Sequence, residues 1–434
     1  MSFPRYQSYK ESGVEWLGEV PAHWEVVQFK QLVDIQNGSD HKHVEAADGY
    51  PVLGSGGIFT YASDFLYDGE SVLLGRKGTI DKPLHITGRF WTVDTMYWTK
   101  INPGTSGRFT YYSALTIPFD YYSTNTALPS MTKGALSSHL VVRPPLLEQA
   151  QIADFLDHET AKIDELVAEQ RRLMELLKEK RQAVISHAVT KGLNPDVPMK
   201  PSGIEWLGDV PAHWDVNHVR RYLNKSLSNG IFKKKEEFGQ GALLVNVFDI
   251  YRDNFLIDYP SLDRILCSRE EQAGYEVLAD DAFFVRSSLK REGIAAVAVA
   301  GKIDEAVVFE CHLIQARFDP QRFLGRFARY LFNSMEYRAH MVRSAKVTTM
   351  TTIDQEAIAS TPILVPPLKE QTAIAAFLDR ETSKIDGLVS EAQRAIDLLQ
   401  ERRTALISAA VTGQIDVCGL APQQERSHLE MVER

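Results

Sequence analysis

Basic residues on short glycine-bounded loops are the side chains whose types and spacing could do chemistry in this sequence. The segment Gly75–Thr79 reads GRKGT and places Arg76 and Lys77 between two glycines. Adjacent cations on such a loop suit contacts with phosphate groups, or a bidentate contact with a guanine base. A solvated turn is the alternative interpretation of the same residues.

Further basic segments lie in the second half of the chain. Residues 286–293 read RSSLKREG, lie between two predicted strands and correspond in placement to GRKGT. Lys233–Lys235 form a cation run that is more often a solvated loop. The segments 126–134 and 346–352 correspond in position, since each carries a Met and hydroxyls shortly before a Pro-Pro pair. The candidate DNA-contacting residues are Ser55, Arg76, Lys77, Thr79, Lys133, Lys233, Lys234, Lys235, Arg286, Ser287, Lys290, Arg291, Lys346 and Thr349.

No catalytic motif is found. The sequence contains no GxxxxGK[ST], HExxH or GxSxG motif, and no GxGxxG follows a predicted strand. GSGG (residues 54–57) predicts a flexible loop rather than a phosphate cradle. We predict no metal site, because Cys267, Cys311 and Cys418 are far apart and His23 and His213 have no partner at ligand spacing.

Two long helices must position these loops. Residues 144–190 begin with Pro-Pro, lack glycine and are rich in helix formers, which predicts a helix of roughly 43 residues and about 65 Å. Residues 366–412 repeat this stretch with most positions identical. We expect the two helices to form one antiparallel pair with a pseudo-two-fold axis.

An imperfect heptad pattern runs through both helices, which favours a coiled coil. The first seam is predicted as Ile163, Leu166, Gln170, Leu173, Leu177, Lys180, Val184 and His187, with Leu176, Val167 and Ile185 widening the apolar stripe. The second is predicted as Ile385, Leu388, Ala392, Ala395, Leu399, Arg402, Leu406 and Ala409.

A second repeated motif precedes each variable block. Residues 9–26 and 199–216 share the pattern WLG-x-VPAHW. Trp16, Pro21 and Trp24, with their counterparts Trp206, Pro211 and Trp214, predict a buried structural brace.

The variable blocks, residues 25–143 and 215–365, are predicted to be rich in strands and turns. Strands are expected at 72–78 and 90–98 in the first block, and at 242–250, 282–286, 294–300 and 307–318 in the second. A helix is expected from Arg322 to about Ala345. Acidic and basic residues nearly cancel within each block, so the net charge of −9 comes from the helices and flanking segments.

The chain resembles the specificity (S) subunit of type I restriction–modification systems. The resemblance rests on WLGEVPAHW and WLGDVPAHW, on the paired PPL-x-EQ helices, and on the GRKGT loop. It implies an α+β fold with two β-rich mixed α/β target recognition domains, joined by two long antiparallel coiled-coil helices in an internal repeat. The implied domains are 1–143 (brace and first recognition domain), 144–192 (first helix), 193–365 (brace and second recognition domain), 366–417 (second helix) and 418–434 (polar tail).

The resemblance also implies the partners. Double-stranded DNA with a bipartite target, two methylating M subunits, and translocating, cleaving R subunits would bind this chain. S-adenosylmethionine and ATP with Mg²⁺ would belong to those partners, so no cofactor is expected here. We expect a non-catalytic protein. We also expect it in the cytoplasm, since the N-terminus lacks the apolar core of a signal peptide.

Two other classes of protein stay open from the residues. One is a nuclease or methyltransferase with an unrecognised site, which would act as the purified chain alone. The other is a coiled-coil scaffold or adhesin with two β-rich modules and no role on DNA, which would enrich no DNA sequence.

Overall fold

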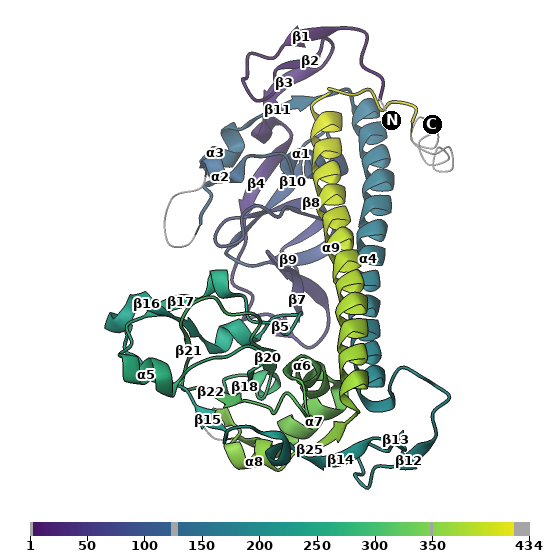
Figure 1. The fold of residues 1–434 in the computed structure, drawn as a ribbon. Helices are drawn as coiled ribbons and strands as arrows, with labels where there is room; N and C mark the ends of the chain where they lie inside the picture. Colours follow the sequence, from purple (N-terminus) through teal and green to yellow (C-terminus); the bar gives the residue numbers. More distant parts are fainter. Residues whose placement is uncertain (1–2, 123–128, 348–349, 421–434) are drawn as a thin grey trace. The chain divides into compact units, whose positions relative to one another are not determined.

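The computed structural model describes residues 3–122, 129–347 and 350–420, in two compact units (Figure 1). Unit 1 comprises residues 1–170 and 394–434, and unit 2 comprises residues 171–393. Each unit therefore contains one half of each long helix. Among the described residues, no helix is long and apolar enough to cross a membrane.

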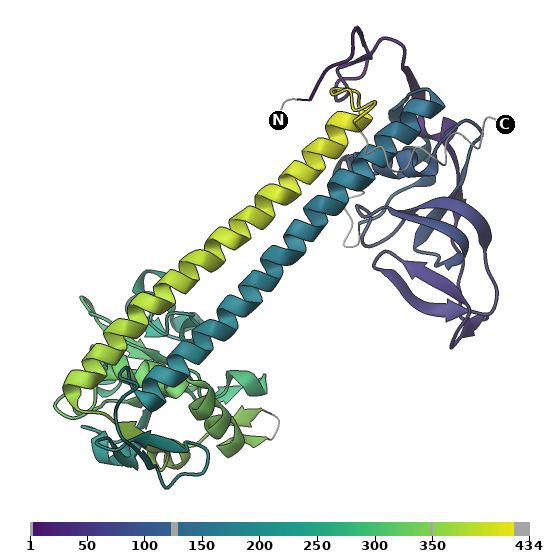
Figure 2. The same cartoon turned by 90° about the vertical axis from the view of Figure 1, so that its right-hand side faces the viewer.

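The predicted long helices are present as α4 (Leu146–Lys191, 46 residues) and α9 (Leu368–Val411, 44 residues). In unit 1, Arg403 Nε of α9 lies 3.1 Å from Asp164 Oδ1 of α4. In unit 2, Arg181 Nε of α4 lies 3.1 Å from Asp386 Oδ1 of α9. The start of each helix pairs with the end of the other, so they are antiparallel, and Figure 2 shows the two halves in each unit side by side.

The predicted seam is wrong at three of its leucines. Leu166, Leu173 and Leu388 are 44%, 43% and 50% exposed, while Val167 and Ile396 are buried instead. Both helices also pack against the globular part of each unit, since Ile152 and Leu406 join a core of unit 1 while Ile185 and Leu378 join a core of unit 2. A straight α-helix repeats every 3.6 residues rather than 3.5, so its buried stripe drifts away from a strict heptad.

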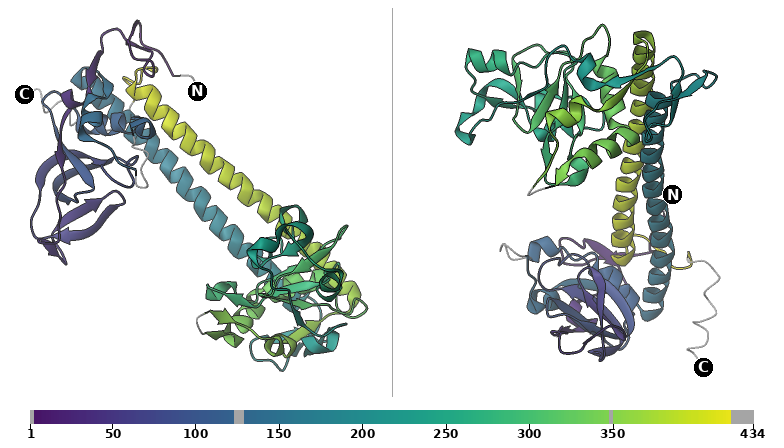
Figure 3. Two further views of the ribbon diagram at one scale, coloured as in Figure 1. Left: turned by 90° about the vertical axis from the view of Figure 1, so that its left-hand side faces the viewer. Right: turned by 90° about the horizontal axis from the view of Figure 1, so that it is seen from below.

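Unit 1 is built around a seven-stranded sheet in the order β4-β10-β8-β9-β6-β7-β5. Figure 3 shows its strands on one side of the unit's helix pair. The strands of unit 1, including those outside this sheet, are β1 (Tyr9–Glu11), β2 (Glu19–Pro21), β3 (Glu25–Gln28), β4 (Val33–Asn37), β5 (Glu45–Ala46), β6 (Tyr50–Gly54), β7 (Gly57–Ala62), β8 (Tyr67–Gly75), β9 (Leu84–Thr92), β10 (Met96–Ile101) and β11 (Leu140–Arg143). The short helices are α1 (Gly107–Ala114), α2 (Phe119–Tyr122) and α3 (Lys133–Ser138).

Unit 2 divides its strands among smaller sheets, with orders β15-β22-β18-β20, β17-β16-β21 and β19-β24-β23. Its strands are β12 (Met199–Pro201), β13 (Asp209–Pro211), β14 (Asp215–His218), β15 (Ser228–Asn229), β16 (Phe238–Val245), β17 (Asp263–Ile265), β18 (Ala282–Val285), β19 (Ser287–Ser288), β20 (Val297–Val299), β21 (Val307–Phe309), β22 (Leu313–Ala316), β23 (Lys346–Val347), β24 (Thr351–Thr352) and β25 (Pro362–Val365). Its short helices are α5 (Arg269–Gly274), α6 (Gly325–Asn333), α7 (Met335–Ser344) and α8 (Gln355–Ala359).

Four local predictions need correction. The strand expected at 307–318 is two strands, β21 and β22, which belong to different sheets. GSGG forms the tight turn between β6 and β7, with Leu53 opposite Ile58, rather than a flexible loop. The expected strand at 242–250 ends at Val245 and continues as a short 3-10 helix. The helix expected from Arg322 is split into α6 and α7, because Ser334 is extended and the Asn333 amide bonds to the backbone of Val297.

The brace motif clamps the start of each long helix. Trp24 is fully buried, and its Nε1 donates to Glu148 Oε2 of α4 at 2.8 Å, while His23 Nε2 lies 2.8 Å from the other carboxylate oxygen. Unit 2 repeats the clamp with Trp214, His213 and Glu370, at 2.8 and 2.6 Å. The histidines are therefore structural.

Burial of the brace is predicted correctly for Trp24 and Trp214 but not for Trp16, which is 52% exposed and stacks on His139. Its counterpart Trp206 is better covered, because it packs on Tyr337 and His340 of α7.

Candidate nucleic-acid interface

The GRKGT loop of unit 1 is fixed by backbone hydrogen bonds. It follows β8, and the N–H groups of Arg76 and Lys77 donate to Thr95 O at 2.9 and 3.1 Å. Gly78 N donates to Pro129 O and Met131 N donates to Arg76 O, both at 2.9 Å. These bonds join the loop to the segment before α3, so its side chains project from a rigid backbone.

The loop keeps its cationic groups accessible. Lys77 and Thr79 are exposed, and Arg76 is half-buried with Nη1 donating to Asp94 O at 3.2 Å. Gly78 has a φ of +85°, a left-handed backbone conformation that a residue with a side chain would adopt only with strain. The geometry therefore presents adjacent cations, which can bind phosphate oxygens or a guanine edge.

The second basic segment of unit 2 is built on the same plan. Ser287 and Ser288 of β19 pair with Thr352 and Thr351 of β24, which in turn pairs with β23. The Ile353 N–H donates to Arg286 O at 2.9 Å, as Met131 donates to Arg76. The predicted correspondence between the two basic loops is thus confirmed in backbone structure.

Around this loop, Arg286, Lys290, Arg291 and Lys346 are exposed, and Lys346 Nζ lies 3.0 Å from Asp354 Oδ2. Ser287 is buried and its hydroxyl is hydrogen-bonded to His312 Nδ1. Thr349 lies outside the described residues.

The other candidate residues lie on three further segments. Ser55 is at the tip of the β6–β7 hairpin, and Lys133 is exposed at the start of α3. Lys234 and Lys235 are exposed, but the Lys233 side chain is only 8% exposed. Its hydrogen bonds to Glu237 and Glu271 raise the pKa of Lys233 and reduce its freedom to contact a phosphate.

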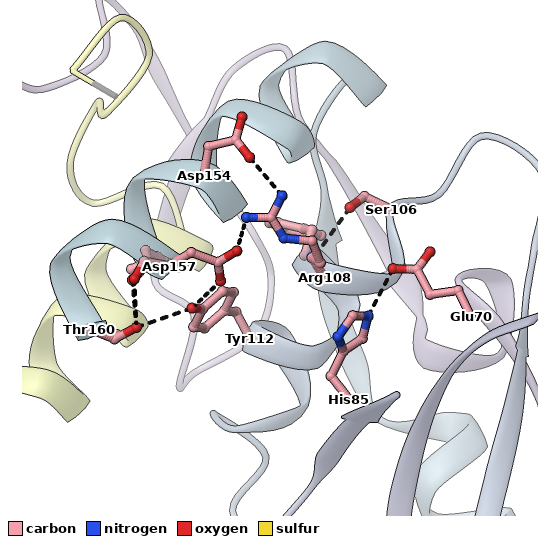
Figure 4. Close-up of polar contacts among 10 residues, drawn as sticks. Glu70, His85, Ser106, Arg108, Tyr112, Asp154, Asp157 and Thr160 are labelled. Carbon is pink, nitrogen blue, oxygen red and sulfur yellow. Dashed lines mark hydrogen bonds and ion pairs between the residues drawn. The ribbon is translucent and has the colours of Figure 1, made fainter. Parts of the chain in front are cut away.

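A polar network anchors the seven-stranded sheet of unit 1 to α4 through α1 (Figure 4). The Tyr112 hydroxyl donates to Asp157 Oδ1 at 2.5 Å and lies 3.2 Å from Thr160 Oγ1. Arg108 pairs with Asp154 at 2.7 Å and also with Asp157. Burial raises the pKa of Tyr112, which keeps its hydroxyl protonated as a donor.

The other side of α1 faces the sheet. A Cβ atom at Gly107 would lie 2.2 Å from Glu70 Cδ, so a side chain at this position would displace the Glu70 carboxylate. The hydrogen bond from His85 lowers the pKa of Glu70 and holds its carboxylate in place.

Unit 2 repeats the Tyr–Asp–Thr part of this anchor, with an arginine from a different position, and sequence reasoning missed it. Tyr330 Oη donates to Asp379 Oδ1 at 2.6 Å and lies 3.4 Å from Thr382, while the buried Arg329 pairs with the same carboxylate. The segments GRFTYY (107–112) and GRFARY (325–330) are a third internal repeat. An alignment of the two variable blocks that places Gly107 opposite Gly325 would have revealed this repeat.

A glutamine next to each clamp glutamate joins the same anchor. Gln149 Oε1 accepts from Ser106 N, and Gln371 Oε1 accepts from Leu324 N, both at 2.8 Å just before α1 and α6. The glutamate of PPL-x-EQ thus holds the brace, and the glutamine holds the segment that begins α1 or α6.

Among the described residues, the one group with metal-ligating atoms within 4.8 Å of one another is Glu310, Cys311 and His312. Burial raises the pKa of the Cys311 thiol and of Glu310, which disfavours the deprotonated forms that bind metals. This donor set fits a metal ion poorly.

Comparison with known proteins identifies the class. The family model described as the type I restriction modification DNA specificity domain matches residues 21–173 and 258–389. The EcoBI specificity subunit of Escherichia coli is 20% identical over 434 residues, covering 93% of this chain and 89% of the relative. The EcoKI specificity subunit of E. coli K12 is 24% identical over 279 residues, 63% of this chain and 57% of that subunit.

Solved structures share the fold. A chain from a structural study of complex assembly and conformational transition of the type I R-M system aligns with a TM-score of 0.69 at 14% identity, covering 90% of this chain and 98% of that chain. The HsdS subunit from Thermoanaerobacter tengcongensis aligns with a TM-score of 0.51 at 13% identity, covering 91% and 98%.

The chain belongs to the family of type I restriction–modification DNA specificity subunits. In type I systems the catalytic activities lie in the M and R subunits. This chain spans little more than half of the length of the first relatives that it matches, 57% for the EcoKI and StySPI specificity subunits.

Proposed function

We propose that this chain selects the DNA target of a type I restriction–modification complex, with each unit reading one half of a bipartite site. The observation that carries the proposal is the equivalent backbone in both units at Arg76 and Arg286. One scaffold bearing different side chains suits the reading of two different half-sites. Cations on the loops position the DNA, and a few side chains read base edges in the major groove.

The paired helices set the unread gap in this proposal and dock two M subunits. Each helix contributes residues to both units, and 46 residues of α4 correspond to about 69 Å. The repeated brace and helix segments offer the same surface twice, which suits two copies of one partner. R subunits join this complex, and S-adenosylmethionine and ATP with Mg²⁺ bind to the partners in the cytoplasm.

Salt-dependent DNA binding by the reconstituted S and M subunits tests this proposal. Lys77→Gln removes one candidate phosphate contact, so the slope of log K against log salt should become less steep by about 0.9. Lys302→Gln is the matched control, because Lys302 is an exposed lysine that is not among the candidate residues. Failure of the wild-type complex to prefer any DNA sequence would reject the proposal in favour of a scaffold.

A further inference from the structure

Two large apolar side chains of unit 2 are almost fully exposed. Phe248 is 84% exposed on the 3-10 helix Val247–Ile250, and Leu289 is 86% exposed directly after β19. Both line one cavity of about 820 Å³. Large apolar groups that gather at an exposed cavity mark a binding surface.

This surface is held in shape by close packing. Tyr251 Oη donates to Gly293 O at 3.3 Å, and Ser288 Oγ accepts from Lys290 N at 3.2 Å. A Cβ atom at Gly293 would lie 2.7 Å from Tyr251 Oη and 2.6 Å from Ser288 Oγ. The loop that carries Leu289 therefore needs glycine at this position to approach Tyr251.

The charges around the cavity indicate which part of DNA fits into it. The exposed cations Arg286 and Arg291 lie on the same loop as Leu289. The cavity itself is lined by the acidic side chains of Asp263, Glu292 and Glu310 and by Lys290 and His312, together with the apolar pair. Asp263 and Glu292 outnumber Lys290 in the lining even where the raised pKa of Glu310 leaves it neutral, so an uncharged base edge fits the cavity better than a phosphate does.

We infer that Phe248 and Leu289 contact the C5-methyl group of thymine in the half-site read by unit 2. Thymine is the base that presents an apolar group in the major groove, and apolar side chains recognise it there. The inference rests on the proposed function and adds a base preference to it. Phe248 and Leu289 are specificity-determining residues in this account.

Uracil substitution tests the contact, since uracil differs from thymine only by the missing methyl group. The wild-type S–M complex is titrated with target duplexes in which each thymine is replaced in turn. Losing one buried methyl should weaken binding about fourfold at one or more positions of a single half-site. The same substitution should have no effect on the complexes with Leu289→Ala and Phe248→Ala.

Leu266→Ala is the matched control, because Leu266 is an exposed leucine of unit 2 outside the cavity. It should keep the uracil effect. A uracil effect that is absent, or that persists in both cavity variants, overturns the inference while specific binding supports the proposed function. Variants that lose the M subunit instead would identify the surface as a protein interface, and a complex without any sequence preference would overturn both proposals.

Discussion

Removing one hydroxyl group tests the anchor that holds the recognition part of unit 1 on α4. In Tyr112→Phe, the ring of a residue that is only 3% exposed stays in place, but its bonds to Asp157 and Thr160 are lost. A hydrogen bond to a charged group contributes about 1.5–3 kcal/mol. Asp157 keeps Arg108 and is 44% exposed, so solvent replaces part of the loss. We expect a cost near the lower end, about 1.5 kcal/mol.

Two assays apply. Thermal unfolding measures the loss of stability, and amide hydrogen exchange in the native state shows where in the chain it occurs. A loss of about 1.5 kcal/mol should lower Tm by roughly 3–6 °C for a unit of this size. Faster exchange should appear in α1 and in the first half of α4. Tyr330→Phe is the matched variant of unit 2, and the two losses should add because they lie in separate units. A change below about 0.5 kcal/mol, or exchange changes elsewhere, would refute the reasoning.

Three further predictions concern the clamp, the pH dependence and the helix pair. Glu148→Ala leaves the buried Trp24 Nε1 without its acceptor and should cost about 1–3 kcal/mol in chemical unfolding; Glu148→Gln should cost less, and equal losses would contradict this account. Burial lowers the pKa of His139 to about 4, so the unfolded state binds a proton more readily between pH 6.5 and 4. Stability should therefore fall by about 3 kcal/mol as pH drops through this window, and His139→Gln should remove that dependence in pH-resolved unfolding. Inserting four residues at equivalent places in α4 and α9 adds about 6 Å and should lengthen the methylated target by about two base pairs, whereas an unchanged gap would reject the helices as a ruler.

The repeats made the long helices and the braces predictable. Residues 144–190 lack helix breakers after their first turn, and α4 covers nearly all of them. The buried face was harder to predict, because Leu166 and Leu173 fit a heptad as well as Val167 fits the observed stripe. Which face is buried depends on the globular part of each unit, and that packing is not visible in a helix sequence considered alone.

The candidate interface was predictable in position but not in detail. Glycines and cations identified the loops around Arg76 and Arg286, and their backbone bonds agree with the predicted correspondence. The tertiary partners of Lys233 could not be foreseen, since Glu271 is distant in sequence. Phe248 and Leu289 escaped notice because isolated apolar residues in loops are common, and only their shared cavity distinguishes them.

Methylation mapping tests the central claim most directly. The chain is expressed with its cognate M subunit in a host free of DNA methylation, and the modified bases of the genome are sequenced. The account predicts one bipartite motif with a fixed gap, and a change confined to one half-site when Leu289 and Phe248 are replaced together. An absence of sequence-specific methylation from a co-purifying, folded complex would contradict it.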